Sequence, residues 1–166
     1  LVYKYAPILE NNFSEQELNN FINSIKKKIP SLQTFTERLK TLGWSNHNDF
    51  YKSKKNKDRV RIVLELIEGH LSGRINFEDS TLEHILPDSQ NNENALIGNI
   101  ILLEDGINQN CKDKSFREKL NFYMNSNYKM ARELANRYRN KEFLPQKRTD
   151  FLANIIYKDI LHLDKI

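Results

Sequence analysis

The stretch TLEHILPDSQNNENALIGNIILL, residues 81–103, marks the point where the chain changes character. An extended segment covers residues 81–86, a polar and acidic loop follows Pro87, and an apolar segment covers residues 97–103. Short apolar runs bounded by proline, glycine and asparagine are typical of strands, so the stretch predicts a β-hairpin. The rest of the chain has to be organised around these two strands.

Helical periodicity precedes the hairpin. Ser14 begins a capping-box pattern, Phe13 is placed to pack against Leu18, and apolar residues then recur at spacings of three and four. Ser31 can cap a second helix, and Gly43 lies where the C-terminal glycine of that helix is expected. The beginning of the chain is therefore predicted to be helical.

The segments that flank the hairpin are also mainly helical. A third helix is expected over residues 58–73, and a short β-like segment, residues 75–77, follows it. Beyond the hairpin, helical spacing returns over residues 116–138. A cap at Thr149 or Asp150 predicts a last helix.

The resulting fold class is mainly α with a small β-hairpin. Residues 1–73 are expected to form a helical lead-in subdomain, and residues 74–166 a hairpin core with C-terminal helices, together one compact unit. The chain begins with Leu1 instead of Met. This start indicates a fragment of a longer protein, although a trimmed N-terminus would look the same.

Composition narrows the class of protein. Cys111 is the single cysteine, so no intrachain disulfide can form, which suits a reducing cytosol. No apolar run approaches the ~20 residues that span a bilayer, and the N-terminus has no signal-peptide pattern. We therefore expect a soluble cytoplasmic protein without membrane contact.

Charge is segregated along the chain. Residues 26–61 carry eleven basic and three acidic side chains, residues 62–105 carry one and nine, and residues 112–148 carry eleven and four. Basic segments around an acidic centre suit a metal-dependent enzyme that acts on a polyanion, because carboxylates hold the cation and Lys or Arg hold phosphates. Solvated helix faces would produce the same pattern.

The hairpin contains the residue types that phosphodiester hydrolysis needs. A base deprotonates water, and a cation held by oxygen ligands stabilises charge on the phosphate, roles that His84, Glu83 and Asn108 can fill. Neighbouring strand residues point to opposite faces, so Glu83 and His84 can converge only where the chain bends near Pro87. Asn99 can hydrogen-bond the loop and hold the imidazole in place.

Two sequence resemblances support that chemistry. EHILP at residues 83–87, GNIILL at 98–103 and Asn108 resemble the HNH, or ββα-metal, nucleases. A fuller pattern, from about Trp44 to the C-terminus, resembles the C-terminal nuclease domain of GmrSD-type modification-dependent restriction enzymes. Its motifs are LEHILP at 82–87, IGN at 97–99, SFREK at 115–119, Tyr123 with Ser126, and Arg148.

The resemblance implies a role for each motif residue. His84 would be the general base, Glu83 and Asn108 would bind a single Mg²⁺ or Mn²⁺ ion, and Asn99 would be the orienting residue. The fold that it implies is a ββα-metal core. The cation would stabilise the leaving 3′ oxygen, so 5′-phosphate and 3′-hydroxyl ends are expected.

Phosphate contacts are assigned from charge and position alone. Lys112, Lys114 and Arg117 follow on the helix side of the motif. The run KSKKNK, residues 52–57, is interpreted as a basic loop that can track a nucleic-acid backbone. Several tyrosines lie at helical spacing, which favours core packing over base stacking. They are Tyr123, Tyr128 and Tyr138.

The function predicted in this way is a metal-dependent, DNA-nicking endonuclease domain of a prokaryotic restriction or anti-phage protein. A nucleotide-binding or sensor domain is expected N-terminal to it in the parent protein, because no base-reading motif is present here. Two alternatives remain open. The chain could be a non-catalytic DNA-binding module that retains the hairpin, or an HNH nuclease that acts on RNA.

Overall fold

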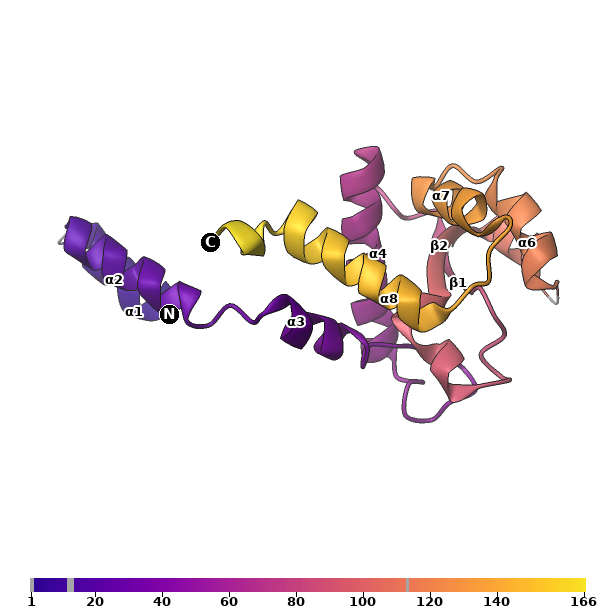
Figure 1. The fold of residues 1–166 in the computed structure, drawn as a ribbon, viewed down its shortest axis with the longest axis horizontal. Helices are drawn as coiled ribbons and strands as arrows, with labels where there is room; N and C mark the ends of the chain where they lie inside the picture. Colours follow the sequence, from indigo (N-terminus) through magenta and orange to yellow (C-terminus); the bar gives the residue numbers. More distant parts are fainter. Residues whose placement is uncertain (1, 12–13, 113) are drawn as a thin grey trace.

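The computed structural model describes residues 2–11, 14–112 and 114–166 (Figure 1). Its main elements are α1 (Val2–Asn11), α2 (Glu15–Lys26), α3 (Leu32–Leu39), α4 (Lys54–Ser72), β1 (Ser80–His84), β2 (Ile100–Glu104), α5 (Asp105–Cys111), α6 (Phe116–Tyr123), α7 (Lys129–Tyr138) and α8 (Pro145–Asn154). Short turns of 3-10 helix, η1 (Asn92–Ala95) and η2 (Ile97–Asn99), precede β2, and a π-helical turn, η3 (Ile155–Ile160), extends α8. The prediction of a mainly helical fold with a small hairpin is confirmed.

The two strands form an antiparallel hairpin with regular register. Ser80 lies opposite Glu104, and His84 lies opposite Ile100. β1 therefore ends at His84, two residues earlier than the predicted strand. The predicted β-like segment, residues 75–77, is irregular, and the Ile75 side chain is 96% exposed, because neither strand of the hairpin pairs with it.

Helix starts follow their capping residues. Ser14 and Ser31 cap α2 and α3 as the sequence predicts, and Ser115 caps α6. Each serine accepts a hydrogen bond from a backbone amide of the first turn. Ser53 caps α4 in the same way, so this helix begins at Lys54, earlier than predicted, and the basic run 52–57 enters the helix instead of forming a loop. The Phe13 contact lies outside the described residues.

Two further helix ends differ from the prediction. α8 begins at Pro145, not after Thr149 or Asp150, because proline is well suited to the first helical position. α3 is capped at Lys40, and Gly43 instead pairs with Leu96 in an isolated bridge. A Cβ atom on Gly43 would lie 2.4 Å from the carbonyl oxygen of Ala95, so the glycine permits this close approach.

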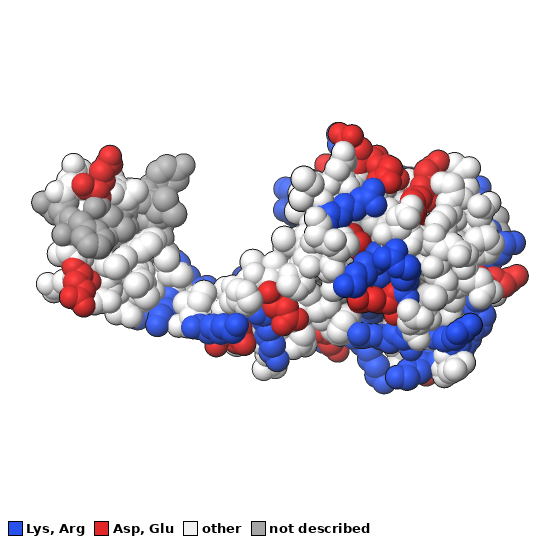
Figure 2. All heavy atoms as spheres, turned by 90° about the horizontal axis from the view of Figure 1, so that it is seen from above, with Lys and Arg blue, Asp and Glu red and all other residues white. Residues whose placement is uncertain are grey.

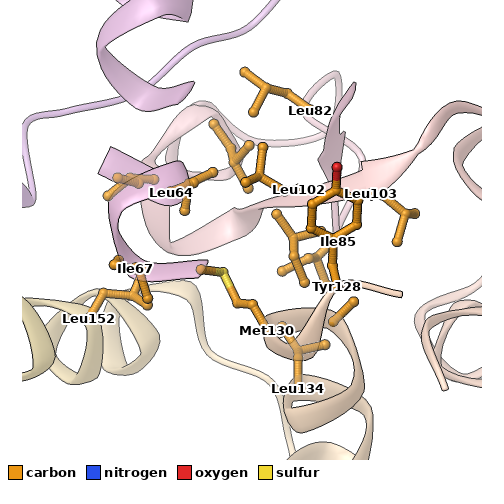
Figure 3. Close-up of a cluster of buried hydrophobic side chains, with 14 of the residues drawn as sticks. Leu64, Ile67, Leu82, Ile85, Leu102, Leu103, Tyr128, Met130, Leu134 and Leu152 are labelled. Carbon is orange, nitrogen blue, oxygen red and sulfur yellow. The ribbon is translucent and has the colours of Figure 1, made fainter. Parts of the chain in front are cut away.

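The core lies between the hairpin and three helices (Figure 3). Leu64 and Ile67 of α4, Met130 and Leu134 of α7, and Leu152 of α8 are packed in one cluster with β2, whose residues 100–103 are fully buried. Tyr123 and Tyr128 are also buried, as predicted for core residues. Because β2 is buried on both faces, it holds the hairpin against the surrounding helices.

Buried charges join segments that are distant in sequence. Glu68 of α4 accepts hydrogen bonds of 2.8 Å from the backbone amides of Lys129 and Met130, at the start of α7. Arg148 of α8 donates to the carbonyl oxygens of Gly98, at 3.0 Å, and Ile100, at 2.8 Å. These contacts place α7 and α8 around β2.

The N-terminal helices differ from the rest of the chain in their surroundings. Figure 1 shows α1 and α2 side by side at one end of the molecule, apart from the hairpin, whereas α3 packs on α8 and α4 packs on α7 and β2. The boundary at residue 73 remains a prediction. Within the described part of the chain, every helix is too short or too polar to cross a bilayer.

Candidate active site

An open groove lies at the end of β1. It is lined on one side by Trp44, Asn46 and His47, at its floor by Glu83, His84 and Asp88, and on the other side by Lys112, Lys114, Ser115, Phe116 and Lys119. The α3–α4 connection therefore forms one wall and the α5–α6 segment forms the other. The hairpin end between them brings the predicted base and the predicted acidic ligand to one surface.

The imidazole of His84 is held by Trp44. Its Nε2 atom lies 2.8 Å from the backbone carbonyl oxygen of Trp44, and the two rings stack with centroids 5.2 Å apart. A carbonyl oxygen only accepts hydrogen bonds, so Nε2 carries the proton and Nδ1 has the free lone pair of a neutral ring. Burial lowers the pKa of His84, against the opposing effects of the Trp44 carbonyl and the Asp88 carboxylate.

Trp44 is itself fixed by the loop before β2. Its backbone amide donates to the carbonyl oxygen of Ala95 at 2.8 Å, next to the close approach at Gly43. The ammonium of Lys57 lies over the indole ring, 4.6 Å from its centroid. The wall of the groove and the orientation of His84 thus depend on the same segment.

Asp88 is the nearest carboxylate to the free side of the imidazole. Its Oδ2 atom lies 3.8 Å from Nδ1 of His84 and accepts a 2.6 Å hydrogen bond from the hydroxyl of Ser45. The Nε2 atom of His47 lies 3.9 Å from the other oxygen of Asp88. At these separations Asp88 acts on His84 electrostatically and not through a direct hydrogen bond.

Glu83 points to the opposite side of the strand, as the alternation of strand side chains predicts. Its Oε1 atom lies 2.5 Å from the Lys119 ammonium and 3.4 Å from the Tyr123 hydroxyl. Lys119 also donates to the backbone carbonyl oxygen of His84 at 2.8 Å. Both Glu83 and His84 line the groove because it passes around the end of β1.

Asn99 closes the loop between the strands. Its Oδ1 atom accepts from the amide of Leu86, and its Nδ2 atom donates to the carbonyl oxygens of Leu86 and Asn94, at distances of 2.7–2.9 Å. This is the loop contact that the sequence predicts for Asn99. The imidazole, however, is held by the carbonyl oxygen of Trp44.

Asn108 lies on α5 beside the start of β1. Its Nδ2 atom donates to the hydroxyl of Thr81 at 2.8 Å, and Thr81 and Glu83 share one face of the strand. No described residue hydrogen-bonds the Oδ1 atom of Asn108. This side chain is not among those that line the groove.

The donor atoms suit a hard divalent cation. Glu83 offers a carboxylate oxygen, Oε2, that is outside the contacts with Lys119 and Tyr123, and Asn108 offers an amide oxygen. Mg²⁺ is commonly bound by one or two carboxylates together with waters and substrate phosphates. Among the described residues, no three His, Cys, Asp or Glu side chains are grouped as a complete site, so an ion here would need such additional oxygens.

The predicted phosphate contacts separate into two groups. Lys112 and Lys114 line the groove, whereas Arg117 donates to the carbonyl oxygens of Tyr138 and Arg139 at the end of α7. Figure 2 shows Lys and Arg gathered along one edge of the larger part of the molecule, with Asp and Glu along the opposite edge.

Sequence reasoning did not assign site roles to Trp44, Asp88 or Lys119. For Lys119 a signal exists, because this charged residue lies on the apolar face of α6 with Phe116 and Tyr123, where it needs a buried partner. For Trp44 no such signal exists. Its contact with His84 uses a backbone oxygen, which every residue has.

A family model described as GmrSD restriction endonucleases, C-terminal domain, matches residues 43–155. This region begins immediately before Trp44 and includes the hairpin, the groove and α4–α8. Neither the curated proteins nor the solved structures contain a match to the chain.

Proposed function

The chain belongs to the family of C-terminal domains of GmrSD restriction endonucleases, and on that premise we propose that it is a metal-dependent endonuclease domain that nicks DNA. The observation that carries the proposal is the hydrogen bonding of the His84 imidazole. Its Nε2–H is committed to the Trp44 carbonyl oxygen, and Nδ1 is the basic atom at an open groove with lysines on one wall.

His84 would act as the general base. Burial lowers its pKa, so the imidazole is neutral near pH 7 and can take a proton from a water molecule that attacks the scissile phosphorus. The carboxylate of Asp88, 3.8 Å from Nδ1, stabilises the imidazolium that results. Asn99 maintains the loop that carries Asp88.

Glu83 and Asn108 would hold a single Mg²⁺ or Mn²⁺ ion through their free oxygen atoms. When bound, the cation would stabilise negative charge on the phosphoryl group and on the leaving 3′ oxygen, which yields 5′-phosphate ends. Lys112 and Lys114 would hold phosphates of the substrate from the facing wall. One such site cuts one strand, so a double-strand break would need two copies or two visits.

The parent protein is proposed to be longer and to act in the cytoplasm of a prokaryote against foreign DNA. The family description, a C-terminal domain, supports a preceding part of the protein. A nucleotide-binding or sensor domain there would supply the recognition that no motif in this chain provides.

Conversion of supercoiled plasmid to open circle tests the proposal. Wild-type protein is assayed with Mg²⁺, Mn²⁺ or EDTA, beside His84→Ala, Asn108→Ala and the matched control His70→Ala, an exposed histidine on α4. Loss of a general base lowers rates by roughly 10²–10⁴-fold, which we expect for His84→Ala but not for His70→Ala. Equal nicking by folded His84→Ala would refute the role of His84.

The same assay separates the alternatives. DNA binding that is retained without nicking in any metal would favour a non-catalytic module. An RNA of matched length, cleaved faster than single- and double-stranded DNA, would instead identify an RNA nuclease.

A further inference from the structure

Lys119 has no part in the proposed reaction, yet it holds the carboxylate that the reaction needs. We propose that the Lys119 ammonium is a built-in counter-cation that competes with the divalent cation for Glu83. This inference rests on the proposed function, because it takes Glu83 to be a ligand of that cation. It explains why an ion pair is built into the wall of an otherwise open groove.

The contacts of Lys119 resemble those of a bound cation. Its Nζ atom lies 2.5 Å from Oε1 of Glu83 and 2.8 Å from the backbone oxygen of His84, and the residue is only 5% exposed. A carboxylate and a carbonyl oxygen are also the donors that hard divalent ions select. The ammonium therefore neutralises, through Oε1, the same carboxylate whose other oxygen, Oε2, is proposed to bind the ion.

The position of Lys119 is determined by the fold. Ser115 and Glu118 form a capping box that fixes the start of α6, and Phe116 and Tyr123 of the same helix pack against the core. Lys119 lies between these two on the inward face, so its side chain extends from the helix to the end of β1.

Electrostatic repulsion strongly disfavours simultaneous binding of the Lys119 ammonium and a divalent cation to Glu83. A dication bound through Oε2 of Glu83 would lie within a few ångströms of the Lys119 ammonium, and like charges at that range repel strongly in a partly buried site. Binding of a dication therefore requires Lys119 to withdraw or requires additional negative charge. Phosphates of a bound nucleic acid supply that charge, so the domain would take up its cation together with DNA.

Mn²⁺ titration of the DNA-free protein tests the competition. Lys119→Met keeps an apolar stem of similar length but removes the charged ammonium. Lys129→Met is the matched control, because Lys129 is a part-buried lysine that donates to the carbonyl oxygen of Leu71, away from the groove. From the repulsion removed, we expect Lys119→Met to bind Mn²⁺ at least about tenfold tighter than wild type, by calorimetry or by the paramagnetic signal of free Mn²⁺. Lys129→Met should match wild type.

Two further variants test whether the tighter Mn²⁺ binding comes from the release of Glu83 by Lys119. Adding Glu83→Gln to Lys119→Met should abolish the gain, because the competed ligand is then absent. Lys119→Arg, which keeps the charge, should bind Mn²⁺ no more tightly than wild type. Unchanged or weaker Mn²⁺ binding by folded Lys119→Met overturns the competition.

A measurement on the unaltered chain covers the case in which Lys119→Met does not fold. The nitrogen-15 resonance of the Lys119 ammonium is followed by NMR as Mg²⁺ is added. Displacement from Glu83 should shift or broaden this resonance at the same Mg²⁺ concentration that shifts the Glu83 side-chain carboxyl signal. A carboxyl signal that moves while the ammonium resonance stays constant would overturn the inference.

Failure of this inference can be separated from failure of the proposed function. If nicking requires Mn²⁺ and His84 while Lys119→Met leaves Mn²⁺ affinity unchanged, only the competition is overturned. If Mn²⁺ binding does not depend on Glu83 in any variant, with or without a plasmid-derived DNA duplex, the proposed cation site is overturned as well.

Discussion

Two buried glutamates, Glu68 and Glu83, have opposite kinds of partner. Glu68 is fully buried, and its two oxygens accept from the backbone amides of Lys129 and Met130. Glu83 is also buried, but its partners are side-chain groups, the Lys119 ammonium and the Tyr123 hydroxyl, at the edge of an open groove.

The difference indicates which carboxylate is available for chemistry. Backbone amides at a helix start move only if the helix moves, so Glu68 is bound permanently and holds α4 to α7. A lysine side chain can rotate away from its partner, which is what the exchange of cations that we propose for Glu83 requires. Burial and charge alone do not distinguish these two residues, whereas the mobility of their partners does.

The sharpest contrast is expected in nuclease activity. Glu83→Gln removes the charged ligand of the proposed cation and should lower the nicking rate by roughly 10²-fold or more, since bound metal ions supply several kcal/mol of transition-state stabilisation. Glu68→Gln makes the same chemical change away from the groove and should leave the rate per folded molecule unchanged. Plasmid nicking at matched folded concentration measures both, and equal losses would erase the distinction.

The free energy of unfolding should depend more on Glu68 than on Glu83, the reverse of the order expected for activity. Glu68→Ala removes two charge-assisted hydrogen bonds and leaves two backbone donors buried, so we expect a loss of about 3 kcal/mol or more in the free energy of unfolding. Glu83→Ala should lose less, because the freed Lys119 ammonium can turn into the groove. Urea denaturation gives both values. A larger loss for Glu83→Ala would mean that its ion pair is mainly structural.

Substitution of Asn99 tests whether the loop between the two strands is held firmly, as Glu68 holds α4 to α7. Asn99→Asp keeps the acceptor for Leu86 but loses the donor to Leu86 and Asn94, so we expect a loss of about 2 kcal/mol. Hydrogen exchange should rise across residues 87–98. The control Asn125→Asp changes an exposed side chain. Unchanged exchange in the loop would contradict the assigned clamp.

The lysine wall of the groove should affect DNA binding and not folding. Changing Lys112 and Lys114 to Gln should weaken duplex binding about tenfold at low salt and reduce the slope of log affinity against log salt by up to about 1.8, if each contacts one phosphate. Lys27 and Lys28, near the end of α2, provide a charge-matched control pair. Fluorescence anisotropy over a range of salt concentrations measures the slopes. Equal slopes for the two double variants would exclude the groove wall as the binding surface.

The smallest expected effect concerns pH. Because burial lowers the pKa of His84 below its ordinary 6.5, single-turnover nicking should be constant near pH 7 and decline only below pH 6.5. Because the pKa of His84 is lower in the folded state than in the unfolded state, the neutral imidazole stabilises the fold above pH 6.5. This contribution is lost as the pH falls through the lowered pKa. Asp88→Asn removes a charge that raises this pKa, so the acidic limb should move to lower pH. A limb that moves to higher pH would contradict the orientation of Asp88.

The sequence was sufficient for several parts of the fold that depend on local interactions, although the local start signals at Ser53 and Pro145 were missed. Ser14 and Ser31 cap helices because each side chain accepts from an amide three residues later, a contact that sequence spacing determines. The hairpin and its loop were also predicted. A different kind of error occurred where the outcome depends on distant partners, as for residues 75–77, which have strand-like composition but no pairing with either strand of the hairpin.

For the candidate site, the sequence by itself determined the identity of the motif residues, Glu83, His84, Asn99 and Asn108, and the loop contact of Asn99. Only the tertiary structure decided which nitrogen of His84 is free and which cation holds Glu83. Those answers come from the backbone oxygen of Trp44 and the side chain of Lys119, 40 and 36 residues away in the sequence. The physical reason is that tautomer and ion pairing are set by atoms brought together through packing, and such contacts have no fixed spacing along the chain.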